Sequence, residues 1–224
     1  MTTTAGDPGL LPGAPALGVD LGIGDELDAE HVIGDACAAL VAAGLGDGCW
    51  VTTHAVGGTT GGPGDRSPRR HSAMVVVLPA AAGRGDAEIV GLVASAFGGH
   101  GGLGEPVVVL GDATAGAGSG QLAGSGAEQA LVARRAGEQG RAVVYPGSDA
   151  LVGTVTVADV LATAVDDVVL LGGGEVAPDA RLATRDFVRP RRAGGRWVLH
   201  VMPSVGGTLV PFEEPDPKRC CQDK

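Results

Sequence analysis

The sequence predicts a mixed α/β protein, and its periodic apolar pattern is the main reason. In two segments, 25–43 and 86–97, apolar residues recur at the spacing of a helix with one buried face. Two runs rich in β-branched residues, 49–56 and 71–79, are typical of strands. The segment 141–175 adds an apolar run, a well-signalled helix and a second apolar run that ends in three glycines. A strand–helix–strand unit of this size favours a parallel pair.

The first half of the chain has the order of a ferredoxin-like (β)αββαβ half. We expect a weak edge strand, a helix capped by Asp25, the two strands of a hairpin, a second helix and a last strand. These elements lie at 17–21, 25–43, 49–56, 71–79, 86–97 and 106–110.

The second half is predicted to be an αβαβ unit followed by an antiparallel β-meander. Capping-box spacing at Ser125 and Glu128, and again at Thr156 and Asp159, opens its two helices. Its strands are expected at 142–145 and 168–171, and the meander strands at 184–188, 196–202 and 208–212. The two apolar strands of this unit are expected to pair in parallel.

Composition shifts divide the chain into five parts. We expect a flexible leader, an N-terminal α/β half, a Gly/Ala/Ser-rich linker, a C-terminal α/β half with the meander, and a flexible tail. Their bounds are 1–16, 17–112, 113–124, 125–214 and 215–224.

Composition also argues against several functions. The net charge of −10 is unfavourable for general nucleic-acid binding and for an anionic membrane surface. The only lysines are Lys218 and Lys224 in the tail, so neither a pyridoxal phosphate Schiff base nor a Walker-type nucleotide site is expected. Because we find no signal-peptide pattern and no apolar run of ~20 residues, we expect a soluble cytoplasmic protein with reduced thiols.

The vicinal thiols Cys220 and Cys221 are the most unusual local feature. They stand beside two basic residues, which favour the thiolate, and they suit a soft metal or thiol exchange. Two ligands do not close a zinc site, and His54 and His71 are candidates for further ligands. The alternative is a tail with no native role. Cys37, on the apolar face of its helix, is expected to be a structural thiol.

Glycine loops follow two of the predicted strands. The run Gly172, Gly173 and Gly174 follows an apolar strand, where open α/β sheets bind ligands. No capped helix follows it, so helix N-terminal amides for an anion are missing, and ordinary turns are the alternative.

Catalytic motifs are absent from the sequence: there is no nucleophile elbow and no HExxH. Acid–base chemistry by His100, Asp112 and Glu175 is the weak candidate that remains.

Arginines gather in the second half against the acidic background. The group comprises Arg181, Arg185, Arg189, Arg191, Arg192 and Arg196. On alternate strand positions, Arg181, Arg185 and Arg189 would share a face. Such a patch suits a carboxylate, a phosphate or an acidic partner. The alternative is a solvated hairpin paired with the excess acids. The predicted ligand-binding arginines are Arg185, Arg189, Arg191 and Arg192.

These patterns define the function only coarsely. The first hypothesis is a non-catalytic accessory protein that binds a small anion or a protein partner through the arginine hairpin. The second is a small α/β enzyme with a pocket lined by glycine loops and by His100, Asp112 and Glu175. The third is a thiol or soft-metal protein that uses Cys220 and Cys221. The residues carry no motif set of a known family, and they predict neither a substrate nor an oligomeric state.

Overall fold

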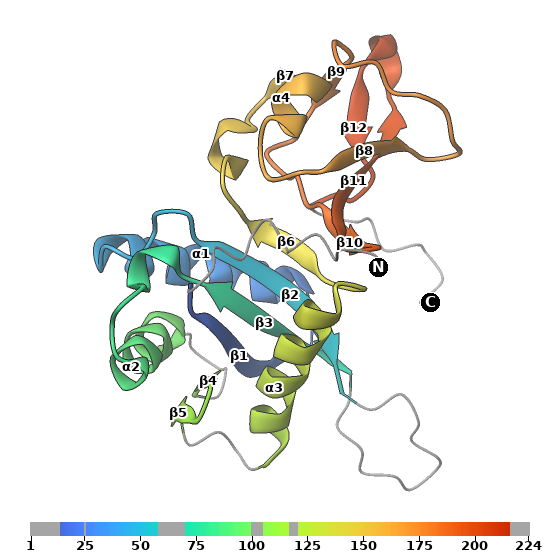
Figure 1. The fold of residues 1–224 in the computed structure, drawn as a ribbon. Coiled ribbons are helices and arrows are strands. Elements are labelled where there is room, and N and C mark those ends of the chain that lie inside the picture. Colours follow the sequence, from blue (N-terminus) through green and yellow to red (C-terminus); the bar gives the residue numbers. More distant parts are fainter. Residues whose placement is uncertain (1–13, 25, 58–69, 100–104, 117–120, 216–224) are drawn as a thin grey trace, which may run out of the picture. The chain divides into compact units, whose positions relative to one another are not determined.

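The chain folds into two compact units. The computed structural model describes residues 14–24, 26–57, 70–99, 105–116 and 121–215 (Figure 1). The first unit consists of residues 1–146 and 192–196, and the second of residues 147–191 and 197–224. Helices and strands occur in both, which confirms the predicted mixed α/β class. No helix in the described ranges is long and apolar enough to cross a membrane.

The first unit is a sheet covered by helices on both faces. Its elements are β1 (Ala16–Ile23), α1 (Glu26–Ala42), β2 (Trp50–Val56), β3 (His71–Val77), the 3-10 turn η1 (Pro79–Ala81), α2 (Asp86–Phe97), β4 (Val107–Leu110), β5 (Ala113–Ala115), α3 (Gln121–Ala136) and β6 (Arg141–Val144). The strands lie in the order β5-β4-β1-β3-β2-β6, and neighbours are antiparallel. The inner order β4-β1-β3-β2 is that of a split βαβ fold, as expected for this half.

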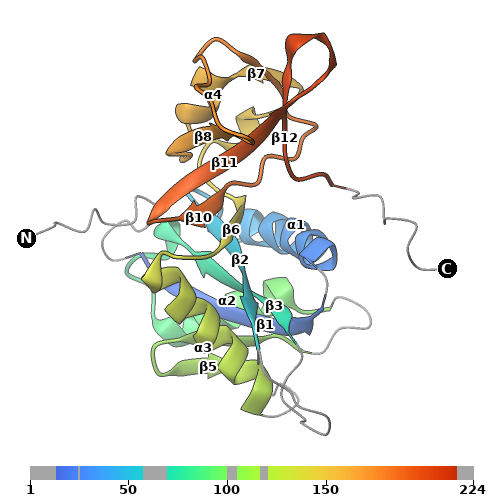
Figure 2. The ribbon, with the colours of Figure 1, turned by 90° about the vertical axis from the view of Figure 1, so that its right-hand side faces the viewer.

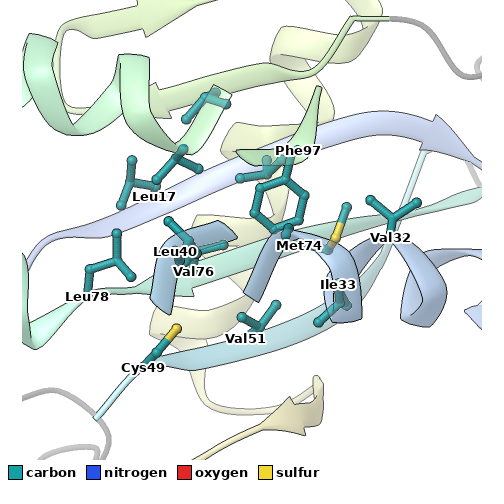
Figure 3. Close-up of a cluster of buried hydrophobic side chains, with 14 of the residues drawn as sticks. Leu17, Val32, Ile33, Leu40, Cys49, Val51, Met74, Val76, Leu78 and Phe97 are labelled. Carbon is teal, nitrogen blue, oxygen red and sulfur yellow. The ribbon is translucent and has the colours of Figure 1, made fainter. Parts of the chain in front are cut away.

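The core of this unit lies between the sheet and the pair α1 and α2. Phe97 of α2 packs with Leu17, Met74 and Val76 of the sheet, and all four side chains are fully buried (Figure 3). Helix α3 lies on the opposite face of the sheet (Figures 1 and 2). It approaches β1 closely because Gly18 has no side chain: a Cβ there would lie 2.3 Å from the carbonyl oxygen of Ala127.

Strand β1 was expected at a sheet edge, and this expectation is wrong. It pairs with β3 on one side and with β4 on the other. Gly18 and Asp20, which lower the apolar content of this strand, lie where α3 packs closely on it. At this contact the small size of Gly18 and the hydrogen bond of the buried Asp20 take the place of large apolar side chains.

The division between units differs from the predicted linker at 113–124. Strand β5 and the start of α3 fall inside that segment and belong to the first unit. Strand β5 pairs with β4 after a tight turn at Gly111, where φ is 58°. Helix α3 begins at Gln121, before the expected cap at Ser125. The predicted leader lies mostly outside the described residues, and so does the tail after residue 215.

The second unit has shorter elements and mixed strand pairing. They are η2 (Ser148–Ala150), β7 (Thr154–Thr156), α4 (Val157–Leu161), β8 (Asp167–Leu170), β9 (Arg181–Ala183), β10 (Arg191–Ala193), which begins in this unit, β11 (Arg196–Pro203), η3 (Val205–Gly207) and β12 (Leu209–Pro211). Strand β11 pairs in parallel with β8 and antiparallel with β12. Strand β9 pairs in parallel with β12 and antiparallel with β7.

Two expectations for the second half are corrected. Strands β6 and β8 do not form the expected parallel pair, because β6 joins β2 and β8 joins β11. The meander is only partly present: β11 and β12 are antiparallel, but 184–188 is not a strand. Arg185 and Asp186 have φ values of 55° and 54°, which turn the chain and are incompatible with extended backbone.

Candidate binding site

A pocket of about 370 Å³ lies within the second unit and combines apolar walls with charged groups. We call it the arginine pocket. Its lining residues are Leu171, Arg189, Arg191, Leu199, His200, Pro211, Phe212 and Glu213. They come from the residue after β8, the segment before β10 and its first residue, the middle of β11, and the end of β12 with the two residues that follow it.

Backbone hydrogen bonds to β11 fix the two exposed apolar walls. The N–H of Leu171 donates to the carbonyl of Val201 at 2.8 Å, and the N–H of Phe212 donates to the carbonyl of His200 at 2.9 Å. Leu171 and Phe212 remain 39% and 54% exposed, whereas Leu199 is buried. The pocket therefore holds solvent-accessible apolar surface on a backbone that the sheet keeps in place.

Three charged side chains and one histidine complete the lining. Arg191 Nε forms an ion pair with Glu213 Oε1. The guanidinium of Arg189 stacks over the ring of Phe187 at 4.5 Å and donates to the carbonyl of Val188 at 3.3 Å. Among these lining residues the two arginines outnumber the one glutamate, so fixed positive charge exceeds negative charge by one. The arrangement suits a ligand with one negative charge.

The structure divides the predicted arginine group. Arg189 and Arg191 line the pocket, but Arg185 lies on the turn after β9 and pairs with Glu214. Arg192 belongs to the first unit and is only 9% exposed. Arg181 is exposed on β9 and lines no part of the pocket. The expected common face of Arg181, Arg185 and Arg189 is absent because the segment between them turns.

The triple glycine follows β8, as the sequence indicated. Gly172, Gly173 and Gly174 have φ values of 91°, 87° and 117°, conformations that side chains rarely adopt. Only Gly174 lines the adjacent hollow, a wider depression of about 730 Å³ that also includes Glu175 and Asp167. A turn closed by the N–H of Ala180 on the carbonyl of Ala177 follows the loop. The first amides of α4 are bonded to this turn: the N–H of Val157 donates to the carbonyl of Ala180 and the N–H of Ala158 donates to the carbonyl of Pro178.

The weak catalytic set is not assembled within either unit. Asp112 occupies the exposed turn between β4 and β5 in the first unit, and Glu175 belongs to the second. His100 lies outside the described residues.

The two hairpin histidines lie on the face of the sheet that α3 covers. His71 donates to the carboxylate of the fully buried Asp20 at 2.9 Å. His54 is hydrogen-bonded to Thr52 at 2.9 Å. Burial, together with the charge of Arg134, lowers the pKa of His54 to about 3. Each histidine thus has a separate structural partner, and no metal cluster joins them.

The tail thiols Cys220 and Cys221, predicted as candidate metal ligands, lie outside the described residues. Within the described part of the chain, no group of three or more His, Cys, Asp and Glu side chains is gathered closely enough to hold a metal ion.

Sequence reasoning found the arginines of the pocket but missed its apolar part. Leu171 and Phe212 each follow a strand directly in the structure, whereas the sequence pattern had included both in the predicted strands. Neither His200 nor Glu213 was predicted as a pocket residue. Their place beside Arg191 depends on strand pairing, which the sequence does not encode locally.

Comparisons with known proteins found no relative. No family model matches the chain, and neither the curated proteins nor the solved structures contain a match.

Proposed function

We propose that this is a binding protein whose second unit takes up a small organic monoanion with an apolar body, such as a medium-chain or aromatic carboxylate. The observation that carries the proposal is the arginine pocket, which places Arg189 and Arg191 beside Leu171 and Phe212. The arginine hairpin predicted from sequence supplies the charged end of this site, and the ends of β8 and β12 supply the apolar end.

The size and lining of the pocket favour a small molecule over a protein surface. About 370 Å³ falls within the ~300–1,000 Å³ typical of ligand sites, which are mostly apolar with a few polar groups that fix orientation. Leu171 and Phe212 are exposed without a ligand, so covering them with an apolar body would release water from their surface.

The charged groups favour a carboxylate head. Arginine presents a planar pair of donors that matches a carboxylate in a bidentate manner. Glu213 forms an ion pair with Arg191 through Nε, and this contact of a carboxylate with the guanidinium supports the proposal. A ligand carboxylate would replace Glu213 there or bind the side of Arg191 that Glu213 leaves open.

The test is calorimetric titration of the full-length protein with carboxylates from butanoate to decanoate, with benzoate, and with octanamide as the neutral isostere of octanoate. We expect one site, affinity that rises with chain length, and weaker binding of octanamide. Inorganic phosphate, which has no apolar body, should bind weakly. Failure of every carboxylate in the panel to bind contradicts the proposal.

Matched arginine variants locate the site. Arg191→Gln should lower carboxylate affinity about tenfold, because a charge-assisted hydrogen bond contributes about 1.5–3 kcal/mol. Arg181→Gln removes an exposed arginine of the same unit that does not line the pocket and should leave affinity unchanged. Glu213→Gln should raise affinity, because it removes the competing carboxylate. Equal losses in Arg191→Gln and Arg181→Gln would show that only the general charge of the unit matters.

A further inference from the structure

Two cysteines outside the tail, Cys37 and Cys49, have their thiols close together in the first unit. Cys37 lies on α1 and is half-buried, and Cys49 immediately precedes β2 and is 6% exposed. A side-chain hydrogen bond joins them, although both are free cysteines. Cys49 belongs to the buried apolar cluster, where it lies near Val51 (Figure 3), and Cys37 packs against the same cluster. The expectation of an isolated structural thiol at Cys37 therefore misses its partner.

The chain between the two cysteines is held by its own hydrogen bonds. After α1, the N–H of Leu45 donates to the carbonyl of Leu40 at 2.9 Å, and the N–H of Cys49 donates to the carbonyl of Gly46 at 3.1 Å. Gly46 packs so closely that a Cβ there would lie 2.4 Å from the side chain of Val41. The short connection is thus fixed at both ends, which keeps the two sulfurs together without a covalent bond.

The pKa values of the two thiols are shifted in opposite directions. The hydrogen bond from Cys49 lowers the pKa of Cys37, against the effect of burial, which raises it. The same hydrogen bond, together with burial, raises the pKa of Cys49. Cys37 is also the more accessible sulfur. An attacking thiolate with an adjacent protonated thiol is the pattern of a redox-active pair, since thiolate character and access decide which cysteine is oxidised first.

We propose that Cys37 and Cys49 are a redox modification site that closes reversibly into a disulfide, with a hydroperoxide as the oxidant. The Cys37 thiolate attacks the terminal peroxide oxygen and the O–O bond breaks, giving a sulfenic acid and, with hydrogen peroxide and one proton, a water molecule. The Cys49 thiol then attacks the Cys37 sulfur. The sulfenic hydroxyl leaves with the Cys49 proton as a second water. Two thiols are oxidised and one peroxide is reduced.

The experiment uses full-length protein in a Cys220→Ser, Cys221→Ser background, so that Cys37 and Cys49 are the only cysteines. Stoichiometric hydrogen peroxide should remove two hydrogens from the intact mass and produce a Cys37–Cys49 linked peptide after digestion. Dithiothreitol should restore the starting mass. The oxidised protein should also unfold at higher urea concentration, because the cross-link restricts the unfolded chain.

Two single variants assign the roles. Cys49→Ser should accumulate a sulfenic acid on Cys37 that dimedone traps, because the second thiol is missing. Cys37→Ser should consume peroxide at least about tenfold more slowly, because the remaining thiol is protonated and buried. If either variant does not fold, differential alkylation of the parent protein in glutathione buffers of graded potential still decides the question.

Other outcomes overturn the proposal. It fails if both cysteines remain alkylatable after peroxide treatment, or if Cys37 proceeds to sulfinic acid without a linked peptide. Equal peroxide consumption by Cys37→Ser and the parent also rules it out. These results are independent of carboxylate binding, which concerns the second unit.

Discussion

The two units treat polar and apolar side chains in opposite ways. The first unit buries titratable groups and gives each at least one hydrogen bond: Asp20, His54 and Arg134 are 0%, 2% and 5% exposed. The second unit leaves large apolar side chains at its surface, including Phe212 at 54% and Val205 at 95% exposure. The contrast is one of degree: among the described residues, Val152, Leu161 and Leu171 of the second unit are exposed as well, whereas the first unit exposes Val41 and Val132.

The free energy of burying polar and apolar groups explains the difference between the two units. A buried polar group destabilises the fold unless it is hydrogen-bonded, so the Asp20–His71 and Thr52–His54 contacts are required for the first unit to fold around them. Exposed apolar surface has no such structural requirement, and a cluster of it beside charged groups indicates a contact site. The first unit therefore shows how the chain folds, and the second holds the proposed binding site.

Two phenylalanines provide the largest expected difference. Phe97→Ala should destabilise the first unit by about 3–5 kcal/mol, because the ring is fully buried in the main core. Phe212→Ala should cost less than about 1 kcal/mol, because half of the ring is already in water, while it weakens carboxylate binding. Urea unfolding followed by tryptophan fluorescence measures both.

The chain supplies one tryptophan probe in each unit. Trp50 reports on the first unit in a Trp197→Phe background, and Trp197 reports on the second in a Trp50→Phe background. Each alanine variant is compared with its own parent. If Phe212→Ala destabilises its unit as much as Phe97→Ala destabilises the first, the exposed apolar residues serve folding, and the contrast between the units is lost.

The buried polar face of the first unit should make its stability depend on pH through His54. The folded pKa of about 3 is below the ordinary 6.5, so between these values the unfolded chain binds a proton that the folded chain does not. The contribution of neutral His54 is therefore complete above pH 6.5 and is lost as the pH falls toward 3. From pH 7.5 to 5 the expected loss is about 2 kcal/mol.

A pair of histidine variants isolates this effect. His54→Gln should remove most of the slope of unfolding free energy against pH between 7.5 and 5, measured by the fluorescence of Trp50. His31→Gln changes an exposed histidine of α1 and should keep the slope. An unchanged slope in His54→Gln would assign the acid sensitivity to other groups and remove His54 from the account of the buried face.

The elements that sequence predicted well are those with local causes. Helices α1 and α2 and the β2–β3 hairpin follow from periodicity within each segment. The position of β1 in the sheet was predicted wrongly because Gly18 and Asp20 are typical of a solvent-facing row. In the structure α3, which follows about a hundred residues later, packs on them. The pairing partners of β6 and β8 are likewise strands that lie far away in the sequence, so local patterns do not predict them.

The same limit applies to the sites. Composition singled out Arg189 and Arg191, because arginine clusters stand out in an acidic chain. Their apolar neighbours Leu171 and Phe212 reach the pocket only through hydrogen bonds to β11, which no local pattern announces. Cys37 and Cys49 have no recognised spacing, and they meet because α1 packs on the sheet beside the start of β2.

The smallest expected effect concerns a local signal in the second unit, the capping box of α4. Thr156 Oγ1 accepts from the N–H of Asp159 at 3.1 Å, and the Asp159 carboxylate accepts from the N–H of Thr156 at 2.8 Å. Thr156→Ala should destabilise the unit by about 1 kcal/mol, the usual cost of an N-cap. The hydrogen bonds from Thr156 also lower the pKa of Asp159, so the cap should weaken only when acid protonates this carboxylate.

The control for the cap is Thr154→Ala, which alters an exposed threonine of β7 two residues earlier and should change the unfolding free energy by less than about 0.5 kcal/mol. Trp197 fluorescence reports both. A cap effect confined to Thr156 would show that a short helix in the less buried unit depends on its own sequence, whereas the helices of the first unit depend on the core. Thr154 and Thr156 both belong to β7. Equal losses of unfolding free energy in the two variants would therefore mean that the threonines stabilise the strand and that the cap adds nothing.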